Sequence, residues 1–73
     1  MSTNRYHIED FTTENGSTAS LYFVRLELSV GVEWSWEGSV GVFNFRCPAM
    51  VDGQFVDRAS VKRTVEEKLK ITP

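Results

Sequence analysis

Residues 21–47 read LYFVRLELSVGVEWSWEGSVGVFNFRC. As far as residue 36, the stretch alternates between polar and apolar or aromatic side chains. The apolar and aromatic residues occupy the even positions: Tyr22, Val24, Leu26, Leu28, Val30, Val32, Trp34 and Trp36. Successive side chains of a strand point to opposite faces of a sheet. The alternation therefore predicts one long strand that is buried on its even-numbered face.

The chain before this stretch predicts a first strand over residues 5–13 and a hairpin loop, Glu14-Asn15-Gly16. Glycine suits the third position of such a loop, because it adopts a positive φ without steric cost. The loop pairs Thr13 with Ser17. The same register sets Ile8 opposite Tyr22 and Tyr6 opposite Val24.

The long strand then covers residues 17–36, which is more than a small sheet usually contains. We expect a bulge or bend at Gly31, because glycine has no side chain to pack. A two-residue turn at Glu37-Gly38 leads into a further strand over residues 39–47. This turn places Val32 opposite Phe43 on the buried face.

The remaining sequence predicts a short hairpin and a helix. Pro48 ends regular pairing, and the Asp52-Gly53 turn pairs Met50 with Phe55. Apolar residues then recur every fourth position, which predicts a helix of about ten residues with this stripe on the sheet: Val61, Val65 and Leu69. Either Asp57 or, preferably, Ser60 caps its N-terminus, and Ile71 extends the apolar stripe.

These elements together predict a single small α+β domain over residues 1–73. Its architecture is a four-stranded antiparallel β-meander followed by one C-terminal helix, ββββα. A chain of this length buries a modest share of its surface, so we expect its stability to depend on association with another chain.

The composition excludes several classes of protein. The chain has one cysteine, Cys47, and one histidine, His7, so we expect no internal disulfide, no zinc site of the usual Cys/His type and no cofactor. We find no signal peptide pattern and no apolar run near the ~20 residues of a membrane span. The sequence therefore predicts a cytoplasmic protein without a membrane partner.

No set of residues has the spacing of a catalytic site. Glu33 and Glu37 lie four residues apart along a strand, about 13 Å, which is too far for a glycosidase pair. We interpret them, with Ser35, as a solvated strand face. His7 is predicted at the surface, and Cys47 as a small core residue with no base beside it. We therefore expect no enzymatic activity.

Nucleic-acid binding is the alternative function. Five of the eight lysines and arginines lie in residues 58–73, and the candidate contacts are Arg58, Lys62, Arg63 and Lys70. However, Lys62–Glu66, Arg63–Glu67 and Glu66–Lys70 are spaced to form ion pairs along a helix. Such pairing is typical of a solvated face, so a nucleic-acid partner is not the favoured interpretation.

The favoured function is a non-enzymatic protein–protein interaction module that presents a sheet face or edge. One short helix cannot cover both faces of a four-stranded sheet, and exposed apolar surface marks interfaces. We expect a homo-oligomer, a dimer in the simplest case, or an unidentified protein partner. If the helix covers the even-numbered face, the candidate interface residues are Phe11, Leu21, Phe23, Val40 and Val42. The reverse choice exposes the tryptophans.

Overall fold

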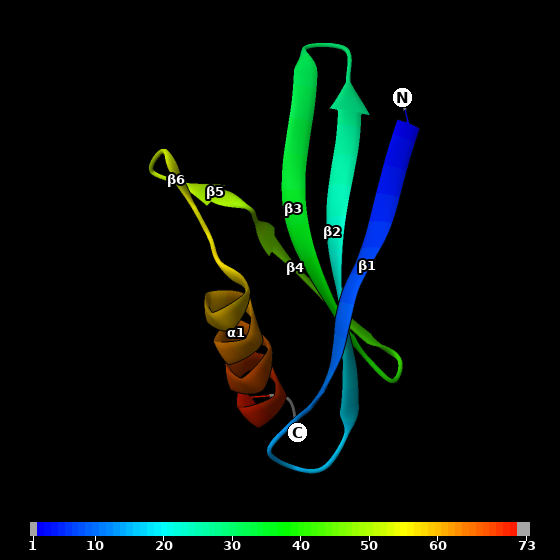
Figure 1. The fold of residues 1–73 in the computed structure, drawn as a ribbon, viewed down its shortest axis with the longest axis vertical. Helices are drawn as coiled ribbons and strands as arrows, with labels where there is room; N and C mark the ends of the chain where they lie inside the picture. Colours follow the sequence, from blue (N-terminus) through cyan, green and yellow to red (C-terminus); the bar gives the residue numbers. More distant parts are fainter. Residues whose placement is uncertain (1, 72–73) are drawn as a thin grey trace.

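The computed structural model describes residues 2–71. The elements follow one another as β1 Ser2–Thr12, β2 Thr18–Leu28, β3 Gly31–Val40, β4 Phe43–Pro48, β5 Met50–Val51, β6 Gln54–Phe55 and α1 Arg58–Ile71. Strands β1 to β4 form an antiparallel sheet in chain order, and β5 and β6 form a separate hairpin (Figure 1). The predicted α+β class, the four-stranded meander and the C-terminal helix are confirmed. The side chain of Ile71, predicted to extend the helix stripe, lies outside the described residues.

The first hairpin loop forms as predicted. The backbone N–H of Thr13 donates to the carbonyl oxygen of Ser17 at 2.8 Å, and Gly16 adopts a φ of 89°. Between His7 and Glu9 a bulge shifts the register by one residue. Tyr6 therefore lies opposite Phe23 instead of the predicted Val24.

The predicted long strand over residues 17–36 is wrong, because the chain turns at Ser29-Val30 within it. The chain turns again at Gly41-Val42, within the strand predicted over residues 39–47. Two-residue turns lie between Leu28 and Gly31 and between Val40 and Phe43. The predicted turn residues Glu37-Gly38 instead lie inside β3 and are buried. Apolar residues occupy the even positions on both sides of Ser29-Val30, so the alternation in the sequence does not mark this turn.

The turn between β2 and β3 also changes which positions share one face of the sheet. Odd positions of β2 lie beside even positions of β3, so Phe23 lies opposite Trp36. The helix-side face of the sheet therefore carries two core clusters, which consist of Leu21, Trp36, Ala49 and Val61 and of Ala19, Val40 and Val65. The prediction of a buried even face is correct for Trp36 and for Val24 of β2, which is 1% exposed. It is wrong about the helix, because the odd positions of β2 face α1 and Val24 lies on the opposite face.

Helix α1 begins earlier than the sequence analysis predicted, since Ser60 was the preferred N-cap. A side-chain oxygen of Asp57 accepts a hydrogen bond from the backbone N–H of Ser60 at 2.9 Å, so Asp57 is the N-cap and not Ser60. The helix has 14 residues instead of about ten. Its predicted stripe faces the sheet, with Val61 and Val65 buried and Leu69 half-buried.

Gly38 allows the helix to approach the sheet. A Cβ atom at this position would lie 2.6 Å from a methyl carbon of Val65. Leu21 and Phe45 are its neighbours on the adjacent strands. The glycine that the sequence suggested as a turn residue is therefore required where α1 crosses β3.

We expect Gly38→Ala to lower the free energy of unfolding by about 1–3 kcal/mol, because the added methyl overlaps Val65. In a double-mutant cycle, Val65→Ala should cost less in the Gly38→Ala background than in the original chain, since it removes the overlapping methyl. Urea denaturation measures the free energy of unfolding of the single and double variants. Ser39→Ala, on the opposite face of β3, is the control. An unchanged denaturation midpoint for Gly38→Ala would contradict this packing.

Candidate interaction surface

Large apolar side chains remain exposed where the sheet extends beyond the helix. Figure 1 shows β1, β2 and β3 continuing past the N-terminal end of α1, with the β5–β6 hairpin beside them. On the helix-side face of this region and on the hairpin lie six side chains, here called the aromatic patch: Tyr6, Phe23, Val32, Trp34, Met50 and Phe55. Trp34 is 39% exposed, Tyr6 49% and Phe55 59%.

Ring contacts order the centre of the aromatic patch. Phe23 stacks on Trp34 with ring centroids 5.1 Å apart, and its edge meets the buried Trp36 at 4.7 Å. Phe55 lies 6.0 Å from the ring of Phe23. The indole N–H of Trp36 donates to the carbonyl oxygen of Val56 at 2.8 Å, which ties the chain after β6 to the sheet. The rings are therefore held in place without a partner.

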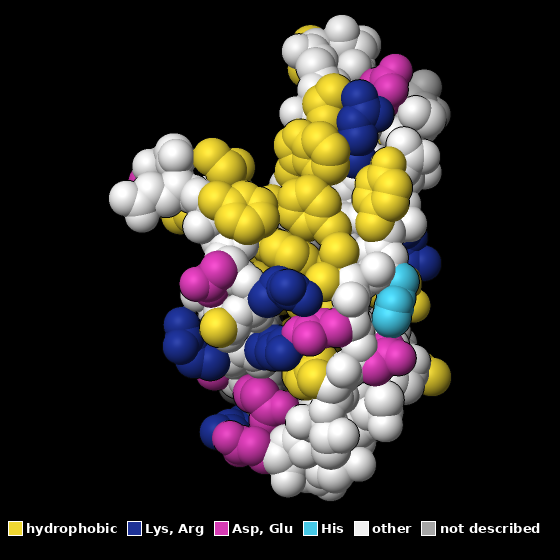
Figure 2. All heavy atoms as spheres, viewed as in Figure 1, with side chains coloured by type: hydrophobic (Ala, Val, Ile, Leu, Met, Phe, Trp, Pro, Cys, Tyr) yellow, Lys and Arg dark blue, Asp and Glu magenta, His cyan; other side chains and the backbone are white. Residues whose placement is uncertain are grey.

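The aromatic patch includes a hollow. Phe23, Trp34, Ala49, Met50 and Phe55 line a cleft of about 230 Å³. Figure 2 shows apolar side chains gathered over the upper strands and on the facing side of the hairpin. The surface therefore combines a raised hairpin with a recess beside it.

One ion pair borders the aromatic patch. The guanidinium of Arg25 lies 5.8 Å from the ring centroid of Trp34 and pairs with the carboxylate of Glu27 at 3.1 Å. A polar rim beside an apolar centre is the usual anatomy of a protein interface.

The opposite face of the sheet carries a carboxylate held by two arginines. Arg5 of β1 donates to one carboxylate oxygen of Glu37 at 2.6 Å, and Arg46 of β4 to the other at 3.3 Å. The Arg5 guanidinium also lies 4.2 Å from the ring centroid of Tyr22. Both carboxylate oxygens of Glu37 thus accept a hydrogen bond from an arginine. This arrangement suits a link between β1, β3 and β4 and not proton transfer.

This arrangement corrects the expectation of a solvated face. Glu33 is exposed, but Ser35 and Glu37 are buried. The sequence could not reveal this, because the arginines that cover Glu37 come from strands whose register depends on the mislocated turns.

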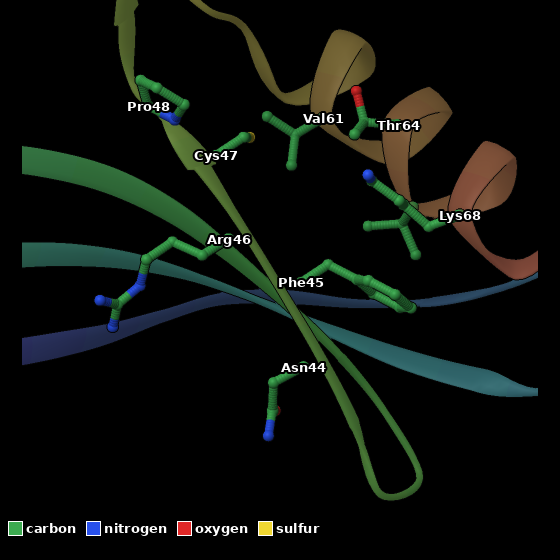
Figure 3. Close-up of a pocket in the computed structure, with 9 residues that line it drawn as sticks. Asn44, Phe45, Arg46, Cys47, Pro48, Val61, Thr64 and Lys68 are labelled. Atoms are coloured by element: carbon green, nitrogen blue, oxygen red, sulfur yellow. The ribbon is translucent and has the colours of Figure 1, made fainter. Parts of the chain in front are cut away.

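A larger cleft of about 590 Å³ lies between β4 and α1 (Figure 3). It is lined by Asn44, Phe45, Arg46, Cys47, Pro48, Val61, Thr64, Val65 and Lys68. Burial raises the pKa of the Cys47 thiol. A raised pKa keeps the thiol protonated at neutral pH, so Cys47 lacks the thiolate that a nucleophile requires.

His7 is exposed, as predicted, and contacts a neighbouring carboxylate. Its Nε2 lies 2.8 Å from a carboxylate oxygen of Asp10, and its ring meets Tyr22 edge-on at 5.5 Å. Hydrogen bonds from His7 and from the Ser20 hydroxyl lower the pKa of Asp10. Neither His7 nor Asp10 lines the 590 Å³ cleft or the 230 Å³ cleft.

The structure separates the five residues predicted as an interface. Leu21 and Val40 lie in the core beneath the helix, and the half-buried Phe11 packs against both core clusters. Phe23 lies in the aromatic patch, and Val42 is 89% exposed in the turn between β3 and β4. Exposure of the whole set required the helix to cover the sheet face that carries the even positions of β2, but α1 covers the face that carries Leu21.

The predicted nucleic-acid contacts on α1 face carboxylates of β1 and its loop. Lys62 forms an ion pair with Glu9, and Arg58 lies 4.0 Å from the same carboxylate. Lys70 pairs with Glu14 at 3.4 Å. Arg63 donates to the Ser60 hydroxyl at 3.2 Å. The spacing of four residues between opposite charges predicted ion pairs within α1, but Arg58, Lys62 and Lys70 instead attach the helix to β1 and its loop.

Within residues 2–71, no group of three or more His, Cys, Asp or Glu side chains is placed to hold a metal ion. None of the described helices is long and apolar enough to span a membrane. The chain matches no protein-family model, no curated protein and no solved structure. The function must therefore be argued from the surfaces themselves.

We expect the protein to lose stability in acid. The pKa of Asp57 is lowered by hydrogen bonds from Ser60, and that of Asp10 by those from His7 and Ser20. A carboxyl whose folded pKa is below its unfolded value of 3.8 stabilises the fold above that value. This stabilisation disappears as the pH falls through the folded pKa.

Asp57→Asn tests this dependence, because asparagine also caps helices but does not titrate. Combined with Asp10→Asn, it should flatten the fall of the urea midpoint below about pH 4. Asp52→Asn, in the β5–β6 turn, is the control. If the double variant and the original chain lose stability equally in acid, the acid sensitivity does not come from Asp57 and Asp10.

Proposed function

We propose that this protein is a non-enzymatic protein–protein interaction module that forms a homodimer through the aromatic patch. The observation that carries the proposal is the exposure of Tyr6, Trp34 and Phe55 together on one part of the surface. The proposal includes a cytoplasmic location, since the single Cys47 requires no oxidising compartment.

The extent of the aromatic patch supports an interface. An aromatic side chain can bury about 150–250 Å². Five side chains of the aromatic patch are each about half exposed. Together they therefore present about 400–500 Å² of apolar surface. The largest apolar patch of a typical monomer has a similar size and is often functional. A standard interface buries about 800 Å² per partner, of which about 65% is apolar in a homodimer. The aromatic patch therefore matches the apolar part of one such interface.

Its composition also fits this role. Tryptophan, tyrosine, phenylalanine and methionine are enriched at interfaces, and binding energy concentrates in a few central residues. Trp34 is such a candidate, because Phe23 supports its ring from below and Arg25 lies at the edge. The rings are already ordered by contacts within one chain, so association would cost little side-chain entropy.

A second copy is the partner that the shape favours. The β5–β6 hairpin projects beside the strands of the sheet (Figure 1) and bears Phe55 and Met50, which line one side of the recessed cleft. A two-fold axis through such a surface brings the raised part of each copy to the recess of the other. The net charge of −2 opposes this association weakly.

The alternative of nucleic-acid binding gains little support. Base stacking on exposed rings requires cations that track the phosphates. Arg25, at the edge of the aromatic patch, is already paired with Glu27, and Lys62 and Lys70 are paired with carboxylates of β1 and its loop. Protein association requires no such cations.

Sedimentation velocity across a dilution series tests the proposal. We expect a concentration-dependent dimer whose dissociation constant rises at least about tenfold in Trp34→Glu and in Phe55→Glu, because each carboxylate would be buried at the interface. Both variants should remain folded by circular dichroism, since these side chains are partly exposed in one chain.

Val42→Glu is the matched control, because Val42 is exposed in the β3–β4 turn, outside the aromatic patch. It should leave the dissociation constant unchanged. A monomer at high concentration would overturn the dimer. A dimer weakened by Val42→Glu and unaffected by Trp34→Glu would overturn the assignment to the aromatic patch.

A further inference from the structure

Strand β4 leaves one of its edges unpaired. Among the described strands, it has β3 as its single neighbour. The backbone N–H of Ala49 donates to the carbonyl oxygen of Trp34 at 3.1 Å. Backbone groups of an antiparallel strand point alternately to either side, so those of Cys47 and Phe45 also face β3. Arg46 and Asn44 therefore point their N–H and C=O groups away from the sheet.

The 590 Å³ cleft runs along this edge. Its lining includes every residue from Asn44 to Pro48 and, on the other side, residues from three successive turns of α1. Figure 3 shows Phe45 and Cys47 pointing toward the helix, where Val61, Thr64 and Lys68 face them. Arg46 and Asn44 point to the other side of the strand. A strand edge with a helix beside it is a geometry that accepts an added strand.

The lining specifies the chemistry of that strand. On the helix side the cleft offers Phe45, Val61 and Val65, which favour apolar side chains. Its charged residues, Arg46 and Lys68, are both cationic, although the chain as a whole carries a net charge of −2. Arg46 is half-exposed, and its present partner Glu37 is also held by Arg5 at the shorter distance of 2.6 Å.

We infer that β4 binds an extended acidic peptide segment of another protein as an additional strand. The backbone of the segment pairs with Asn44 and Arg46. Its alternate side chains are apolar and pack between β4 and α1, and the intervening ones are acidic and face Arg46. This site is separate from the aromatic patch and does not depend on the proposed dimer.

A second copy of β4 fits this edge less well. Antiparallel pairing of two β4 strands sets their Arg46 side chains on one face and close together. Like charges on neighbouring positions of a strand pair are destabilising. Pro48 also lacks an N–H, so a paired copy would lose a hydrogen bond at each end. An acidic segment avoids the repulsion between two Arg46 side chains and meets the missing N–H of Pro48 only once.

A phage-displayed library of random peptides is the probe. Panning against the folded protein should enrich sequences in which apolar and acidic residues alternate. A synthetic copy of an enriched peptide should bind about tenfold more weakly to Asn44→Pro, because proline removes one outward N–H and leaves the ladder to β3 intact. Arg46→Gln should weaken binding and reduce its salt dependence.

Thr3→Pro is the matched control, since it places proline in β1, the other edge strand, and should leave binding unchanged. The bound peptide should also protect the amides of Asn44 and Arg46 from hydrogen exchange. Failure to enrich alternating sequences, or a peptide that binds Asn44→Pro and the original chain equally, would overturn the inference. Protection confined to the aromatic patch would overturn it as well.

Discussion

The structure depends on the close contact between Val65 of α1 and Gly38 of β3. Without a side chain at residue 38, the helix lies directly on the sheet, and a Cβ there would come within 2.6 Å of Val65. The two core clusters lie around this contact: Leu21, Trp36 and Val61 belong to one, and Ala19 and Val40 to the other. Both bury side chains of β2 and β3 against α1. The crossing point therefore determines which part of the sheet becomes core.

The crossing point of α1 and β3 also determines which parts of the sheet the helix leaves uncovered. A helix of 14 residues is about 21 Å long, whereas the molecule extends over 40 Å. Where the strands continue past the helix, Trp34 and Phe55 stay exposed. Where the helix stands beside the sheet edge, it forms one wall of the cleft along β4. Both proposed binding sites thus follow from the position of one short helix.

Local chemistry in the sequence predicted more than the long-range pattern did. The loop ending at Gly16, the pairing of Met50 with Phe55 and the stripe from Val61 to Leu69 depend on neighbouring residues, and all three are confirmed. The turn after Leu28 was expected only as a bulge or bend at Gly31, because apolar residues occupy the even positions on both sides of it. The turn after Val40 was wrongly placed at Glu37-Gly38. The bulge between His7 and Glu9 left no signal in composition either. The aromatic patch could not be predicted, since its members come from β1, β2, β3, β5 and β6, and their proximity depends on those registers.

We propose that the surface left uncovered by the helix binds a second copy of the chain. Isotope-filtered nuclear Overhauser spectroscopy on a mixture of labelled and unlabelled protein tests it most directly. We expect intermolecular contacts between the indole protons of Trp34 in one copy and the side chains of Phe55 or Met50 in the other. If no intermolecular contacts occur at these residues, or if they are confined to the β4 edge, a dimer through the aromatic patch is contradicted.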